Sequence, residues 1–255
     1  MQVLQKGRIL LMGALMGCAL IFNHNPAGAT GQQNDNTKDM VWAASDGVRH
    51  AIYISTWSNN SWSDPVKVTT DNTDNITPCI DVAADGTKYL VWTTVDTKGH
   101  RIRYAVYSGN AWSAPKELPD QPEGANAPFI AVDDAGTAWV VFTGNDGVDD
   151  DIYCSRFIKG AWSKPSRVNA PNQTPDMNPY IEITASNTVV ATWQGFREEG
   201  YTMLQSVWGK GKWQAEEPAA AEEAASAEED TTAAQDTIPD FVVDKRQVFT
   251  RSYTK

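Results

Sequence analysis

The middle of the chain consists of short runs in which apolar and polar residues alternate, and turn residues separate one run from the next. Alternation with a period of two is typical of β-strands, because successive side chains of a strand point to opposite faces of a sheet. In one such unit the turns lie at Asp85-Gly86-Thr87 and Ser108-Gly109-Asn110. The pattern predicts four strands in this unit, over Cys79–Ala83, Tyr89–Thr94, Arg101–Ser108 and Trp112–Leu118.

The unit recurs along the chain with a period of about 50 residues. Three sets of aromatic residues share separations of 50, 50 and 51, and a set of prolines shares separations of 50 and 51. The four sets are Trp62, Trp112, Trp162 and Trp213; Trp42, Trp92, Phe142 and Trp193; Trp57, Tyr107, Phe157 and Trp208; and Pro78, Pro128 and Pro179. Four-stranded units repeated at this period predict an all-β fold, a β-propeller of about four blades.

The repeated aromatic residues are expected to pack between blades. A single twisted sheet cannot bury both of its faces, whereas blades arranged side by side bury each other's faces. Nine of the ten tryptophans fall on the three repeated aromatic positions, and Trp139 is the exception. Packing, rather than ligand binding, is therefore the expected role of these indoles. The turn position held by Gly86, Gly136, Asn187 and Asn36 is expected to need a positive φ angle.

The exit of the third strand carries a second signature. Residues 55–62, Ser-Thr-Trp-Ser-Asn-Asn-Ser-Trp, resemble the Asp-box (S-x-D-x-G-x-T-W) of sialidase-type BNR propellers. Ser55, Ser61 and Trp62 match the box, whereas its aspartate position is aromatic in every unit. The resemblance covers residues 38–213 and implies a propeller in which the box is a structural turn. None of the six arginines of this region maps onto the arginine triad of a sialidase, so sialidase activity is not expected.

The N-terminus has the pattern of an export signal. Lys6 and Arg8 precede Ile9–Phe22, an uncharged stretch of 14 residues that would rise about 21 Å as a helix, too short for the roughly 30 Å of a bilayer core. Ala27-Gly28-Ala29 offers a cleavage site, so residues 1–29 are predicted to be a signal peptide of an exported, periplasmic or secreted protein without a transmembrane span. The alternative is a lipoprotein signal with a lipidated Cys18.

The two ends of the repeat region raise the question of how the propeller closes. The first unit lacks an innermost strand, because residues 30–37 read as a linker. Residues 214–237 are an acidic Ala/Glu-rich linker, and 238–255 form a C-terminal strand segment. Residues 239–244 could pair with Met40–Ala44 and close a four-bladed ring. The alternative is an open array with a truncated fifth unit, which would permit an oligomer.

Composition narrows the range of partners. The formal net charge of −11 argues against a nucleic-acid partner, which would require clustered Lys and Arg. Without Cys18 the mature chain keeps only Cys79 and Cys154, which are expected to be small buried hydrophobes. We expect a binding protein for a carbohydrate or a protein partner. The alternatives are a glycoside-hydrolase-like enzyme and a structural assembly module.

Candidate ligand-binding residues lie on the loops between the second and third strands. The reference is the aromatic set of Trp42, Trp92, Phe142 and Trp193. One set of polar residues lies four positions after these aromatic residues, and another lies eight positions after them. These polar side chains could face a sugar, a peptide or a cation, although aspartates in such positions are also typical of tight hairpins, the interpretation that we favour. The two sets are Asp46, Asp96, Asp146 and Arg197, and His50, His100, Asp150 and Tyr201.

Metal and catalytic candidates are few. Asp146, Asp149 and Asp151 could hold Ca²⁺, but their spacing does not fit the twelve-residue calcium loop, so a solvated acidic turn without a metal is expected. Asp81 and Glu182 share one repeat position and are the best candidates for a glycosidase carboxylate pair. No catalytic residue and no cofactor is predicted.

Overall fold

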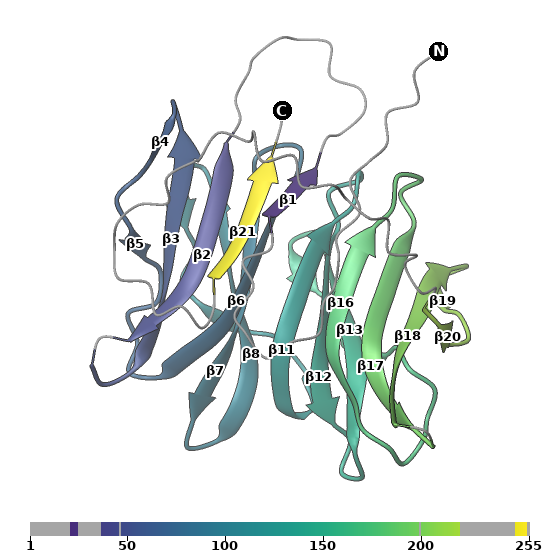
Figure 1. Ribbon diagram of the computed structural model, residues 1–255. Coiled ribbons are helices and arrows are strands. Elements are labelled where there is room, and N and C mark those ends of the chain that lie inside the picture. The colour runs from purple at the N-terminus through teal and green to yellow at the C-terminus, as the bar shows by residue number, and fades with distance from the viewer. Residues whose placement is uncertain (1–20, 25–36, 46, 199, 220–247, 254–255) are drawn as a thin grey trace, which may run out of the picture.

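The computed structural model describes residues 21–24, 37–45, 47–198, 200–219 and 248–253. These residues form four sheets in succession and contain no helix (Figure 1). Each sheet is a blade whose long strands are antiparallel neighbours. The predicted fold, an all-β propeller of four blades, is confirmed. No helix among the described residues is long and apolar enough to cross a membrane.

Each blade has three long strands and an outer edge made of two short strands. Blade 1 contains β1 (Ile21–His24), β21 (Val248–Tyr253), β2 (Lys38–Ser45), β3 (His50–Ser58), β4 (Ser61–Trp62) and β5 (Val66–Lys67). Blade 2 contains β6 (Asp74–Val82), β7 (Lys88–Asp96), β8 (Gly99–Ser108), β9 (Ala111–Trp112) and β10 (Lys116–Glu117). Blade 3 contains β11 (Glu123–Val132), β12 (Ala138–Asn145), β13 (Asp150–Ile158), β14 (Ala161–Trp162) and β15 (Ser166–Arg167). Blade 4 contains β16 (Asp176–Ile183), β17 (Val189–Arg197), β18 (Gly200–Gly209), β19 (Lys212–Trp213) and β20 (Glu217–Pro218).

The fourth strand of each blade is split, where one continuous strand was expected. Pro65, Pro115 and Pro165 stand in the gap in blades 1 to 3, and a proline has no N–H to donate to the neighbouring strand. In blade 4, β20 carries the sheet to residues 217–218, beyond the end of the repeat region expected at residue 213.

The recurring landmarks have clear backbone roles. The residues before the repeated prolines, Thr77, Ala127 and Asn178, have φ angles of 49°, 50° and 53° and lie at register shifts of the innermost strands, so the prolines mark β-bulges. Gly86, Gly136 and Asn187 have φ angles of 85°, 80° and 57°, which confirms the predicted turn position. Asn36 lies outside the described residues.

The serine position of the box-like motif ties the third strand to the fourth. The hydroxyls of Ser55, Ser155 and Ser206 donate to the carbonyls of residues 63, 163 and 214 at 2.8, 2.6 and 2.8 Å. Between these strands, two residues of each turn have positive φ angles, as a tight hairpin requires. The motif is thus a structural turn, as the resemblance implies.

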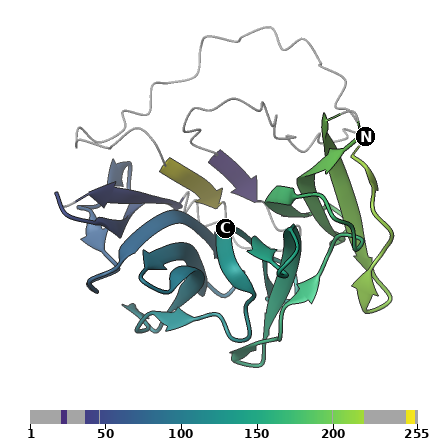
Figure 2. The same cartoon turned by 90° about the horizontal axis from the view of Figure 1, so that it is seen from below.

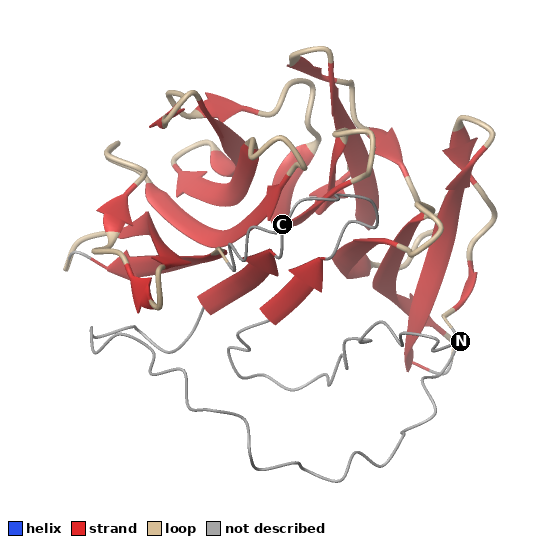
Figure 3. Cartoon of the chain, turned by 90° about the horizontal axis from the view of Figure 1, so that it is seen from above, coloured by secondary structure: helices blue, strands red, loops and turns tan. Residues whose placement is uncertain are grey.

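The blades follow one another along an arc, with β21 and β1 lying between the first and last blades (Figures 2 and 3). Each blade packs against the next through its innermost strand: β6 contacts β2 and β3, β11 contacts β6 to β8, and β16 contacts β11 to β13. Buried apolar residues of blades 2, 3 and 4 form one core cluster, in which Val140, Phe142 and Trp193 are fully buried, and other residues of blade 2, among them Leu90 and Trp92, form a second cluster with blade 1. Cys79 and Cys154 are buried thiols, as expected.

Aromatic rings join the outer parts of blades 3 and 4 to the blade that precedes each. Phe157 of blade 3 lies edge-on to Tyr89 of blade 2, with ring centroids 5.4 Å apart. One repeat later, Trp208 of blade 4 lies edge-on to Trp139 of blade 3 at 5.3 Å. Trp139 therefore occupies the position of Tyr89 and packs between blades, as expected of this indole.

The aromatic residue near the end of the second strand is matched by the residue that faces it on the first strand. The indole N–H of Trp92 donates to Asn75 Oδ1 at 2.8 Å, and that of Trp193 donates to Asp176 Oδ1 at 2.9 Å. In blade 3 the same positions hold Phe142 and Ala125, where no N–H needs an acceptor. A buried donor requires a partner, so the two positions change together.

Blade 1 is completed by the C-terminus. β21 pairs with β2 in antiparallel register, with Met40 opposite Thr250, and β1 pairs with β21 in parallel. A C-terminal strand thus takes the place of the missing innermost strand. The expectation that residues 239–244 would form this strand needs correction, because residues 248–253 pair with β2, while 239–244 lie outside the described residues.

We predict that Asn75→Ala lowers the free energy of unfolding by about 1–3 kcal/mol, because it removes the buried oxygen that accepts from both the Trp92 N–H and the Thr94 hydroxyl. The double variant Asn75→Ala/Trp92→Phe reproduces the blade 3 pair. Its cost, measured by urea denaturation, is expected to be below the sum of the single variants by about 1 kcal/mol. Strict additivity would contradict the assigned hydrogen bond.

We predict that deleting residues 248–255 lowers the free energy of unfolding by about 2–4 kcal/mol, because β2 keeps β3 but loses its second pairing partner, β21, and its buried Val41 gains exposure. Chemical denaturation of the full and shortened proteins measures the difference. A variant lacking only residues 254–255 is the control, and coincident curves for all three proteins would contradict the role of β21.

Candidate functional site

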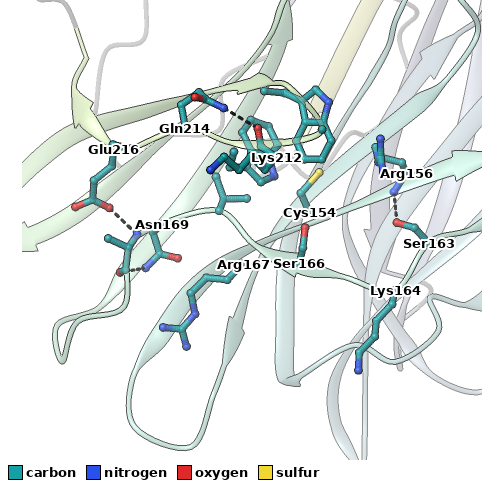
Figure 4. A pocket seen from close by; sticks show the side chains of 16 residues that line it. Cys154, Arg156, Ser163, Lys164, Ser166, Arg167, Asn169, Lys212, Gln214 and Glu216 are labelled. Atoms are coloured by element: carbon teal, nitrogen blue, oxygen red, sulfur yellow. Dashed lines mark hydrogen bonds between the residues drawn. The ribbon is translucent and has the colours of Figure 1, made fainter.

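A pocket of about 590 Å³ lies between the outer parts of blades 3 and 4 (Figure 4). Strand β13 and the segment around β15 supply one wall, and the β18–β19 hairpin with residues 214–216 supplies the other. Figure 4 shows Cys154 and Arg156 of blade 3 facing Lys212 and Gln214 of blade 4. The pocket exists because the aromatic contacts between these blades hold their outer strands apart at a fixed distance.

The inner end of the pocket is aromatic. The Arg156 guanidinium lies 4.5 Å from the ring centroid of Trp208 and 5.1 Å from that of Trp139. Trp213 stands edge-on to Trp208 with centroids 5.4 Å apart, and both indoles line the pocket. Cys154 lies beside them, and complete burial raises the pKa of its thiol, so it acts as an uncharged apolar group.

The rim of the pocket is polar and mostly cationic. Four cationic side chains line the pocket, whereas Glu216 is its single carboxylate, in a chain whose net charge is −11. Glu216 accepts hydrogen bonds from the backbone N–H of Ala170 and from Arg197, both at 2.9 Å. The four cationic residues are Arg156, Lys164, Arg167 and Lys212.

A polar network continues from the pocket to the loop end of blades 3 and 4. Arg167 contacts Asp146 and lies 2.6 Å from the carboxylate of Asp151. The Asn169 amide donates to both Asp151 and Asp176 at 2.8 Å. Asp176, which is fully buried, also accepts from Trp193. Since Arg167 and Asn169 belong to the pocket and to the network, the two features share one wall.

Three carboxylates gather within this network. Oxygen atoms of Asp146, Asp149 and Asp151 all lie within 4.8 Å of one another. Asp151 is fully buried, and Asp149 is only 9% exposed. Neither of the two carboxylate oxygens of Asp149 accepts a hydrogen bond. Burial raises the pKa of Asp149 and of Asp151. The expected solvated acidic turn is thus corrected, because only Asp146 of the three is exposed.

The predicted loop residues lie at the hairpin ends of successive blades. His50 of blade 1 contacts Asp74 of blade 2, with Nδ1 and Oδ1 2.9 Å apart. Asp96 forms a two-point ion pair with Arg101, whose hydrogen bonds lower the pKa of Asp96 to about 2. Asp96 Oδ1 also accepts a hydrogen bond from the backbone N–H of Lys98 at 2.8 Å. This contact is typical of an aspartate in a tight turn, the role that we favour for these residues.

The remaining predicted residues make local contacts or are exposed. Asp150 accepts from the Asn145 amide at 2.9 Å, and Asp146 accepts from the turn N–H of Val148 at 2.9 Å. His100 is exposed, and Tyr201, 59% exposed, packs edge-on against Phe196. Asp46 lies outside the described residues. None of the eight predicted residues lines the pocket; Arg197 touches it through Glu216, and the ligand-binding role of the others stays a prediction.

The two carboxylates weighed for catalysis lie on different blades. Asp81 on β6 accepts the backbone N–H of Val132 on β11 at 2.7 Å and that of Val82 at 2.7 Å, so it joins blade 2 to blade 3. Glu182 is exposed on β16 of blade 4. Blade 3, which carries Ala131 at the same repeat position, stands between them.

Sequence reasoning did not single out Arg156, Lys212 or Glu216. Their juxtaposition depends on how closely two blades approach, which the period of the repeat does not specify. One local signal was present, since Lys212 and Trp213 lie in the run Trp-Gly-Lys-Gly-Lys-Trp of residues 208–213, in which two tryptophans flank two lysines. Glu216 lay in a segment interpreted as linker.

Comparison with known proteins supports the fold. The chain resembles a protein of unknown function from Dyadobacter fermentans (TM-score 0.55, 14% identity), covering 68% of this chain and 60% of that one. It also resembles the endo-arabinase of Bacteroides thetaiotaomicron (TM-score 0.50, 16% identity), covering 74% and 81%. No protein-family model and no curated protein sequence matches this chain, so the likeness to sialidase-type propellers stays one of fold.

We predict that Asp149→Asn stabilises the protein at neutral pH in buffer containing EDTA. The folded state holds the Asp149 proton more tightly than the unfolded state does, so this carboxyl lowers stability as pH rises through its raised pKa. The melting temperature is expected to rise by about 2–4 °C at pH 7 and to match the wild type near pH 4.

Thermal unfolding followed across this pH range measures the effect of Asp149. Asp150→Asn is the matched control, because Asp150 already accepts a hydrogen bond from Asn145 and should give no such gain. A destabilised Asp149→Asn protein at pH 7 in EDTA would contradict the unpaired state of the Asp149 carboxylate.

Proposed function

We propose that this protein is an exported, non-catalytic carbohydrate-binding protein that holds an acidic sugar in the pocket between blades 3 and 4. The observation that carries the proposal is the make-up of that pocket, an aromatic inner end with a cationic rim. Export rests on the predicted signal peptide of residues 1–29, whose removal would take β1 from the edge of blade 1 and leave β21 as its innermost strand. The shared fold with an endo-arabinase is consistent with a carbohydrate ligand, although the pocket itself is the argument.

The aromatic end suits a sugar ring. The C–H faces of pyranose rings are apolar and stack on indoles, and Trp208 and Trp213 line the pocket. The Trp208 indole is held in place by Trp139 and by the Arg156 guanidinium, so little side-chain freedom would be lost on binding. A volume of about 590 Å³ falls within the usual range for small-molecule sites, roughly 300–1,000 Å³.

The rim selects for negative charge. Lys164 and Lys212 are exposed at the pocket and could donate to a carboxylate or sulfate, and charge-assisted hydrogen bonds of this kind are roughly twice as strong as neutral ones. The Glu216 carboxylate accepts hydrogen bonds from Ala170 and Arg197. Its negative charge is therefore partly balanced, and it repels an anionic ligand less than an unpaired carboxylate would. An acidic sugar therefore fits better than a neutral one.

Binding fits the pocket better than hydrolysis does. Glycosidases use a pair of carboxyl groups about 5–10 Å apart. Among the residues that line this pocket only Glu216 carries a carboxylate, and both of its oxygens already accept hydrogen bonds. A pair for acid and base chemistry is missing from this lining.

We predict that the protein binds acidic oligosaccharides, bearing uronate, sialate or sulfate, in preference to neutral ones. Lys164→Ala/Lys212→Ala is expected to weaken binding by about 30–150-fold, since each lost hydrogen bond contributes roughly 1–1.5 kcal/mol and about 1.4 kcal/mol corresponds to tenfold in affinity. Isothermal titration calorimetry with the best ligand of a glycan array measures the loss.

The matched control is Lys159→Ala/Lys210→Ala, which removes two exposed lysines of the neighbouring hairpin turns outside the pocket lining. It removes the same net charge and should leave the affinity within about twofold. Equal losses in both double variants, or equal binding of neutral and acidic glycans, would refute the pocket as the site. Turnover of chromogenic glycosides would favour the enzyme alternative instead.

A further inference from the structure

The loop of blade 3 that carries the acidic cluster differs from its counterpart in blade 2. Fifty residues earlier, Asp96 corresponds to Asp146, whereas Gly99 and Arg101 stand where blade 3 has Asp149 and Asp151. In blade 2 the Arg101 guanidinium pairs with Asp96, at 2.9 and 2.5 Å, and with Glu117, at 3.2 Å, so each of these carboxylates has a cationic partner. Blade 3 has exchanged the glycine and the arginine for two further carboxylates.

A guanidinium of the same blade lies against the blade 3 cluster. Arg167 of β15 contacts Asp146 and lies 2.6 Å from Asp151. Three carboxylates and this guanidinium leave two negative charges in excess. Asp150 and Asp176, which also act on Asp149, add further negative charge nearby.

Asp149 is the residue that Arg167 leaves unpaired. Its side chain is 9% exposed, and both of its oxygens are shielded from solvent without a hydrogen-bond partner. At least one of them lies within 4.8 Å of the carboxylate oxygens of Asp146 and Asp151. A buried carboxylate without a donor is costly, so its retention in this position points to a positively charged ligand.

We propose that Asp146, Asp149 and Asp151 bind a divalent cation of the Ca²⁺ class at the loop end of blade 3. All three side chains offer hard carboxylate oxygens, which suit Ca²⁺ rather than metals that favour nitrogen or sulfur ligands. The excess of two negative charges matches one such ion. The cation would give the Asp149 oxygens the partner that the protein chain does not supply.

The test uses the full-length protein freed of metals by EDTA and then titrated with CaCl₂ at pH 7. Calorimetry is expected to show one bound Ca²⁺ per chain, and the melting temperature should rise with Ca²⁺ concentration. Asp149→Asn should weaken Ca²⁺ binding by at least tenfold. The control Asp96→Asn, at the matching position of blade 2, should bind Ca²⁺ as the wild type does.

The stability of the variant in the two buffers separates binding from misfolding. Asp149→Asn is expected to melt above the wild type in EDTA and below it in saturating Ca²⁺, an inversion that a damaged fold would not produce. Absence of stoichiometric Ca²⁺ binding, or binding that Asp149→Asn leaves intact, would overturn the proposal. Lys164→Ala/Lys212→Ala should retain the Ca²⁺ response, so this test does not depend on the sugar-binding proposal.

Discussion

The packing of aromatic rings between neighbouring blades is the constraint on which the other features depend. Phe157 reaches Tyr89 of the blade before it, and Trp208 reaches Trp139 one repeat later. These contacts fix how far apart adjacent outer strands stand, since rings of this size bury large areas in a narrow range of geometries. The pocket between blades 3 and 4 follows from that spacing, and its innermost residues belong to the same aromatic cluster.

Much of the architecture could be predicted from the repeat. The period identified the blades, Gly86 and Asn187 were recognised as positive-φ turns, and the packing role of Trp139 was expected. The strand that completes blade 1 was placed too early, at 239–244 instead of 248–253, because short apolar motifs such as Pro-x-Phe-x-Val recur by chance. Pairing over such a distance has no local signature.

The site was harder to predict than the fold for a physical reason. Asp149 belongs to a run that looks like any solvated acidic turn, and only the folding of the β12–β13 hairpin onto its own blade removes its carboxylate from water. Arg156 and Glu216 line one pocket from two different blades, an arrangement that depends on tertiary packing. Comparison between repeats was informative, because positions that depart from the repeat, such as Asp149 against Gly99, mark where one blade has acquired its own chemistry.

The union of β2 with β21 has a consequence for how the chain reaches its native state. Partners near opposite ends of the chain can meet only after translation is complete, and contacts so remote in sequence form slowly. Blades 2 to 4 have all their strands in one continuous stretch of the chain and can assemble first. Until β21 pairs with it, the edge of β2 exposes unpaired backbone N–H and C=O groups. A nascent or prematurely terminated chain would therefore be a good substrate for chaperones and proteases.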